Sequence, residues 1–77
     1  MERALPRHNE VWRHFKDKLY WIVTIAQHTE TGEQMVVYQA MYGNNGIYAR
    51  PLDMFMSEVD HEKYPDIEQE YRFVRVE

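Results

Sequence analysis

Five apolar or alternating runs, separated by turn residues, organise the chain, and this spacing favours a small all-β fold over a helical one. The runs span residues 10–15, 19–26, 35–42, 47–50 and 71–76. The second run is rich in β-branched and aromatic residues and is apolar on both faces, which predicts a central, curved strand. In the third run, Val36, Tyr38, Ala40 and Tyr42 fall on one face, while Gln39 marks the other face as the outer one.

Short polar and glycine-containing segments predict where the chain reverses. Asp17 follows the first run and tolerates a left-handed backbone in a tight turn. Gly32 is available for a positive φ in the next turn. The Asn45-Gly46 pair is the preferred sequence of type I′ hairpins. These segments therefore predict hairpins between the first four runs.

A proline after the fourth run predicts a change of structure. Pro51 pushes Arg50 to an extended conformation and suits the first position of a helix, so residues 52–56 are expected to form one short helical turn. Residues 57–70 are acidic, contain Pro65 and have few apolar side chains. They predict a loop that is the least rigid internal segment of the chain.

The order of these elements predicts the fold class. Four strands in meander order, a helical turn and a fifth strand is the order found in SH3-like barrels, so we expect a mainly all-β, five-stranded SH3-like barrel. A chain of this length holds only one core, because it buries roughly 60% of the surface that its unfolded form exposes. Residues 1–77 are expected to form one domain, with residues 1–8 flexible. The expected core residues are Ile22, Val36, Tyr38, Ala40, Ile47 and Phe55.

Composition and charge predict the cellular compartment and limit the classes of partner. The chain has no cysteine, its N-terminus lacks the apolar run of a signal peptide, and no stretch approaches the ~20 apolar residues of a membrane span. These features predict a cytoplasmic protein that packing stabilises. The formal net charge of −4 disfavours nucleic-acid binding, because phosphate neutralisation supplies most non-specific affinity. The basic first twenty residues and the acidic residues 58–70 predict two solvated surfaces of opposite sign.

Few residues fit catalytic or metal-binding arrangements. Nucleophilic catalysis needs an activated side chain beside a base, and Ser57, the only serine, suits a cap or a surface position. The four histidines show no compact ligand spacing, and the adjacent residues of Asp60-His61-Glu62 point in different directions. The glycines fit turns and form no phosphate-binding loop. We therefore expect no catalytic residue, no metal and no cofactor.

A polar and aromatic set remains, which forms either a shallow groove or part of the core and its cover. The candidate ligand-binding residues are His14, His28, Tyr38, Arg50 and Asp53, with Trp12, Trp21, Tyr42 and Tyr48 as neighbouring aromatics. In a groove, the rigid aromatics supply contact area and Arg50 binds a carboxylate or phosphate. Alternatively, Arg50 is structural and pairs with Asp53 or Glu10, which ties the helical turn to the barrel.

Several short motifs together resemble the domain of unknown function 1653 family of short bacterial proteins. The matching pieces are His14-Phe15-Lys16, Ala26-x-His28-x-Glu30-Thr31-Gly32-Glu33, Val36-Val37-Tyr38, Tyr42-Gly43 and Arg50-Pro51-x-x-Met54-Phe55. Asp17 departs from the family, which usually places glycine after this lysine. The resemblance implies a stand-alone domain of prokaryotic source. It implies no activity and no catalytic residue.

Three functions follow as hypotheses. The leading one is a non-enzymatic interaction module that binds a peptide or another protein through aromatics and Arg50. The alternative is a single-stranded nucleic-acid binder that stacks bases on Trp12, Trp21 or Tyr48 and uses the basic N-terminal segment for phosphates. A third is an enzyme acting on a small metabolite. No feature of the sequence specifies an oligomeric state or a membrane role.

Overall fold

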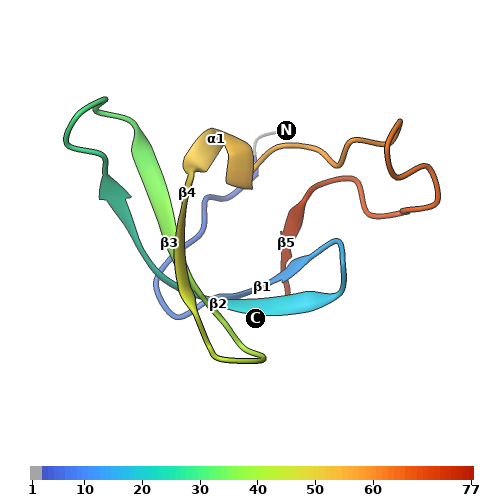
Figure 1. The fold of residues 1–77 in the computed structure, drawn as a ribbon, viewed down its shortest axis with the longest axis horizontal. Coiled ribbons are helices and arrows are strands. Elements are labelled where there is room, and N and C mark those ends of the chain that lie inside the picture. The colour runs from blue at the N-terminus through green and yellow to red at the C-terminus, as the bar shows by residue number, and fades with distance from the viewer. Residues whose placement is uncertain (1–2) are drawn as a thin grey trace.

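The chain forms one antiparallel, five-stranded sheet and one short helix (Figure 1). The structure is a computed structural model that describes residues 3–77. Its elements are β1 (Val11–His14), β2 (Lys18–Gln27), β3 (Gln34–Ala40), β4 (Ile47–Pro51), α1 (Leu52–Phe55) and β5 (Phe73–Arg75). The predicted order of elements is confirmed, and so is the mainly β class.

The sheet is curved but is not closed into a barrel. Its strand order is β4-β3-β2-β1-β5, so β4 and β5 are the edges, and no ladder joins them within residues 3–77. A register shift between Ile22 and Thr24 marks an irregularity of the β-bulge kind in β2, which bends a strand and increases its twist. Figure 1 shows the long β2 crossing between the β1 and β5 part of the sheet and the β3 and β4 part. The predicted SH3-like barrel is thus not confirmed.

An aromatic core joins the two parts of the sheet to α1. Phe55 of α1 stacks on Phe73 of β5, with ring centroids 4.0 Å apart and an interplanar angle of 10°. The remaining buried members of this cluster come from β1, β2 and β3: Trp12, Ile22, Val36 and Tyr38. The predicted core is confirmed at Ile22, Val36, Tyr38, Ala40 and Phe55, which are all buried.

The prediction that Ile47 belongs to the core is wrong, because 62% of its surface is exposed. It lies opposite Gln39 in the β3 and β4 register. Residues opposite each other in adjacent strands share a face of the sheet. Since Gln39 lies on the outer face, the pairing places Ile47 on that face as well.

Two of the three predicted turns have the expected backbone conformation. Asp17 and Gly32 have φ values of 68° and 77°, in the left-handed region that was expected of both. The type I′ turn expected at Asn45-Gly46 is wrong, because only Asn45 of this pair has a positive φ. The strand β3 ends at Ala40, so residues 41–46 form a longer loop instead of a two-residue hairpin turn.

Replacing Asp17 with glycine is expected to stabilise the protein. A left-handed backbone costs a residue with a Cβ roughly 1–2 kcal/mol, and glycine avoids this cost but loses more entropy on folding. A net gain of up to about 1 kcal/mol in the free energy of unfolding is expected in urea denaturation. Asp17→Ala is the control and should not stabilise, because alanine keeps the Cβ. A glycine variant less stable than the wild type would contradict this prediction.

The acidic segment after α1 is a loop whose two ends are held together. Glu58 and Tyr71 form an isolated antiparallel bridge. The backbone N–H of buried Val59 donates to the Glu70 carbonyl at 2.9 Å. The middle of the segment projects from the sheet at the right of Figure 1. These contacts fix the base of the loop at residues 58–59 and 70–71.

The N-terminal segment packs beside β5. The Arg3 guanidinium lies 3.8 Å from the ring centroid of Tyr71 and donates to the carbonyl oxygens of Met56 and Phe73 at 3.1 and 2.6 Å. Met1 and Glu2, at the start of the segment expected to be flexible, lie outside the described residues. Across residues 3–77, none of the helical structure has the length and apolar character that a membrane crossing requires.

Candidate functional site

A polar pocket of about 280 Å³ contains residues from both edges of the sheet. Arg50 lies on β4, and Arg72 directly precedes β5. His14 at the end of β1 lies opposite Phe73 in the register with β5, which brings it next to Arg72. The remaining lining residues follow β1 or belong to the acidic loop: Phe15, Lys16, Asp60, Lys63 and Tyr64.

The lining of this pocket is cationic. It contains four lysine and arginine side chains and a single carboxylate, Asp60. That carboxylate accepts the backbone N–H groups of Glu62 and Lys63 at 3.1 and 3.3 Å, so it is engaged in its own turn. Within residues 3–77, no carboxylate lies at ion-pair distance from Arg50 or Arg72. The pocket is therefore a local region of positive charge in a protein of net negative charge.

Two guanidinium nitrogens of the pocket residues lack a hydrogen-bond partner. Arg50 Nη1 and Arg72 Nε are both buried, and neither has a partner in the described part of the chain. The Arg50 guanidinium lies 5.5 Å from the ring centroid of Phe73, which positions it but accepts no conventional hydrogen bond. Buried donors without partners cost free energy, and in native proteins they call for an explanation such as an ion. An anion in this pocket would compensate both charges.

His14 supplies a neutral donor to the same pocket. Burial, together with the nearby positive charges of Arg50, Lys16 and Arg72, lowers its pKa to about 4. Its Nδ1 accepts the backbone N–H of Lys16 at 3.1 Å. We therefore assign the single proton of the neutral ring to Nε2, which is left as a donor.

The structure brings together His14 and Arg50 of the five candidate residues. Tyr38 lies in the core beneath; burial raises its pKa, and the nearby Arg50 guanidinium opposes this rise. His28 lies beyond the other end of the ten-residue strand β2, where it accepts backbone N–H groups of the hairpin turn. Asp53 is exposed on α1 and does not line the pocket.

The predicted ion pair of Arg50 with Asp53 or Glu10 is wrong. Glu10 instead pairs with Arg75, with 3.4 Å between Oε2 and Nε. The positions of strand ends explain the difference, because Glu10 directly precedes β1 and that strand pairs with β5 rather than with β4. Arg50 instead lies against the Phe73 ring, beside Tyr38 and in the lining of the pocket.

The neighbouring aromatics take different positions. Trp12 is 2% exposed, and its indole N–H donates to Glu10 at 2.9 Å, so it belongs to the core. Tyr42 and Tyr48 are among the exposed large side chains, and Trp21 packs edge-on against His8. None of these four lines the pocket between the sheet edges.

Sequence reasoning missed Arg72 and Tyr64 and did not connect Lys16 and Lys63 with His14. These residues lie in separate segments, and only the pairing of β1 with β5 shows that the end of the acidic loop returns to His14. The sequence contained a weak signal, because Lys63 is a cation within the acidic segment and Arg72 is a cation two residues after it.

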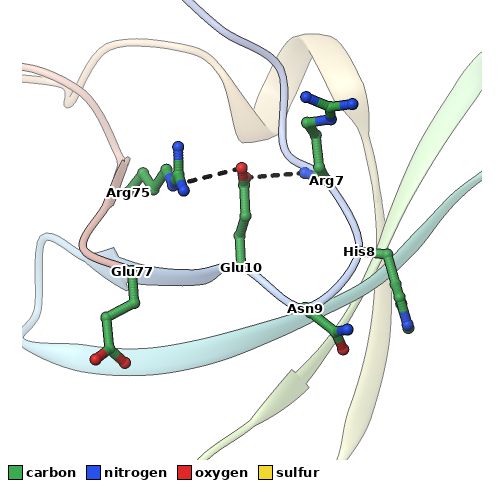
Figure 2. Close-up of a pocket in the computed structure, with 6 residues that line it drawn as sticks. All are labelled: Arg7, His8, Asn9, Glu10, Arg75 and Glu77. Atoms are coloured by element: carbon green, nitrogen blue, oxygen red, sulfur yellow. Dashed lines mark hydrogen bonds and ion pairs between the residues drawn. The ribbon is translucent and has the colours of Figure 1, made fainter.

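A second, larger hollow of about 510 Å³ lies between the N-terminal segment and β5 (Figure 2). Its central group, Glu10, accepts hydrogen bonds from the Arg7 backbone N–H and from Trp12, each at 2.9 Å, and pairs with Arg75. Figure 2 shows the side chains of His8 and Glu77 extending away from this carboxylate. These paired groups fasten the N-terminal segment, so the smaller cationic pocket is the candidate site. No group of three His, Asp or Glu residues within 3–77 is arranged to hold a metal ion.

Fold and pocket define a small, single-sheet β protein with a cationic pocket between the two edges of its sheet. A model of the family described as protein of unknown function (DUF1653) matches residues 10–75, and the chain belongs to this family. The crystal structure of a DUF1653 protein from Bordetella bronchiseptica is similar, with 30% sequence identity and a TM-score of 0.74 over 90% of this chain and 86% of that one. No curated protein matches the chain. The family model spans every residue that lines the pocket.

Proposed function

We propose that this protein is a non-enzymatic interaction module that binds an anionic group of a partner peptide or protein in the pocket of Arg50 and Arg72. The observation that carries this proposal is the pair of guanidinium groups, each with a buried, unpartnered nitrogen, in the lining of one pocket. Guanidinium groups form strong, charge-assisted hydrogen bonds to carboxylate and phosphate.

The chemistry of the lining supports binding rather than catalysis. Its only hydroxyl belongs to Tyr64, and it contains no serine, threonine or cysteine side chain. His14, with a pKa of about 4 and Nδ1 engaged by Lys16, is a poor general base near neutral pH. Its remaining N–H group suits the binding of an anion.

The nucleic-acid alternative has less support. Trp12, one of its three stacking residues, is buried and unavailable to bases. Trp21 and Tyr48 lie outside the lining of the cationic pocket. The net charge of −4 would also repel an extended polyanion.

Titration with a small anionic probe tests this proposal. We expect N-acetylglutamate to produce saturable shifts in the NMR signals of His14, Arg50 and Arg72. Arg50→Gln should weaken binding by about 10–100-fold, because hydrogen bonds to charged groups contribute roughly 1.5–3 kcal/mol. The melting temperature should fall by only a few degrees, since Arg50 has no ion pair to lose within residues 3–77 and its contact with the Phe73 ring contributes roughly 0.5–1 kcal/mol.

Two further variants test whether the Arg50 side chain itself binds the anion. Arg50→Lys keeps the charge but loses the planar fork, so it should weaken binding while leaving stability unchanged. Arg13→Gln is the matched control, because Arg13 is exposed on β1 and does not line the pocket. Equal affinity in the wild type and Arg50→Gln would overturn the proposal, and so would shifts confined to other parts of the sheet.

A further inference from the structure

We propose that the anionic group bound in this pocket is a phosphate monoester, carried by a phosphorylated side chain of the partner. This inference rests on the proposed binding function and specifies its ligand. It follows from the charge of the lining, from the number and type of its donors, and from the acidic surroundings of the pocket.

The charge of the pocket exceeds what a carboxylate compensates. Lys16, Arg50, Lys63 and Arg72 oppose one carboxylate, that of Asp60, and neutral His14 adds no charge. A carboxylate brings a single negative charge, whereas a phosphate monoester carries about −1.5 to −2 at pH 7. The dianion therefore compensates more of this excess.

The donors also match a phosphate. Arg50, Arg72 and His14 all line the pocket, and the neutral His14 ring keeps its single N–H at Nε2. A phosphate monoester presents three terminal oxygens, and a carboxylate presents only two. A third acceptor allows both arginines and the histidine to bind the same group.

The two lysines are held beside the pocket by aromatic rings. Lys16 Nζ lies 5.9 and 5.5 Å from the ring centroids of Phe15 and Tyr64, and Lys63 Nζ lies 5.4 Å from that of Tyr64. The two rings pack with their centroids 5.0 Å apart. Cation–π contacts of this kind restrict flexible ammonium groups. The lysines are thus positioned near the entering charge before binding.

The surroundings favour a single phosphate over a polyanion. The loop that supplies Lys63 is otherwise acidic, and its exposed carboxylates are Glu58, Asp60, Glu62, Asp66, Glu68 and Glu70. These charges repel the successive phosphates of a nucleic-acid backbone that extends beyond the pocket. A single phosphate inside the pocket meets only one of these carboxylates, that of Asp60. A phosphorylated side chain presents such an isolated group, and arginine clusters are a known means of recognising it.

Calorimetric titration with matched probes tests the inference on the full chain. The probes are N-acetyl-O-phosphoserine N-methylamide, N-acetylglutamate N-methylamide, adenosine 5′-monophosphate and inorganic phosphate. We expect the phosphoserine probe to bind at least about tenfold tighter than the glutamate probe, in line with its larger charge. Arg72→Gln should abolish most of this preference, and Arg13→Gln should retain it.

The possible outcomes separate the two proposals. Equal affinity for phosphoserine and glutamate would overturn the phosphate inference and leave the proposed function intact. Binding of neither probe would overturn both. Tighter binding of adenosine 5′-monophosphate than of phosphoserine would overturn the assignment to a phosphorylated side chain.

The pH dependence of binding gives an independent readout. The second pKa of a phosphate monoester is about 6, so lowering the pH from 7.5 to 5.5 should weaken phosphoserine binding about fourfold through loss of the dianion. Glutamate binding should stay constant, because its carboxyl pKa is about 4.3. The titratable and charged groups that face the ligand are His14, Lys16, Arg50, Asp60, Lys63, Tyr64 and Arg72. His14, with its pKa of about 4, stays neutral over this range. A flat profile for phosphoserine would contradict the inference.

Discussion

Replacing Phe55 with alanine is expected to lower the free energy of unfolding by about 3–5 kcal/mol. The Phe55 side chain is fully buried and stacks on Phe73 with 4.0 Å between the ring centroids. Its ring also lies 5.4 and 5.5 Å from those of Trp12 and Tyr38. Because Phe55 is the buried residue of α1, its loss removes the ring contacts of the helix with Trp12 of β1, Tyr38 of β3 and Phe73 of β5.

Urea denaturation of three variants checks this prediction. Phe55→Ala could lose enough stability to unfold, since small domains have only about 5–15 kcal/mol in total. Phe55→Leu keeps most of the volume and is expected to show a smaller, measurable loss. Met54→Ala is the control in the same helical turn, because Met54 is exposed and its truncation should cost less than about 1 kcal/mol. An unchanged melting temperature in Phe55→Ala would show that Phe55 is not central to the core.

Stability should also fall on acidification because of His14. Its pKa in the folded protein is about 4, below the 6.5 of an unfolded chain, so the unfolded chain takes up the proton first. The contribution of the neutral ring is therefore complete above pH 6.5 and is lost as the pH falls toward 4. This difference between the folded and unfolded pKa corresponds to a loss of roughly 2–3 kcal/mol in the free energy of unfolding, after a reduction for the partial exposure of the ring.

The histidine contribution can be separated from that of the carboxylates, which also weaken folding in acid. His14→Gln should flatten the pH dependence between 6.5 and 4 relative to the wild type. His61→Gln is the matched control for the substitution itself, because His61 is exposed on the acidic loop and does not line the pocket. An NMR titration should give His14 a midpoint near pH 4. A midpoint near 6.5, or equal slopes in wild type and His14→Gln, would contradict this account.

Local features of the sequence were sufficient for most secondary structure. The alternation of Val36, Tyr38 and Ala40 predicted both the strand and its buried face, because successive side chains of a strand point to opposite sides. Asp17 and Gly32 adopt the left-handed backbone expected of them. Pro51 precedes the short helix as predicted. These features depend on steric preferences of neighbouring residues, which the sequence contains.

Pairing between strands could not be derived in the same way. In the short strand β4, either Ile47 or Tyr48 could have faced the core by alternation alone. The register with β3 places Ile47 opposite Gln39 on the outer face. The open sheet was missed for a related reason, because the order of elements along the chain does not state whether β4 and β5 pair.

The sequence by itself identified His14 and Arg50 as chemically distinctive residues, since both remained after catalytic and metal-binding patterns had been set aside. Only the tertiary structure decided which residues accompany them. Antiparallel pairing of β1 with β5 brings Arg72 to His14, although they are far apart in the chain, and β2 separates His28 from both. The physical reason is that a pocket between sheet edges depends on long-range pairing and on the path of a loop, whereas side-chain propensities act only over a few neighbouring residues.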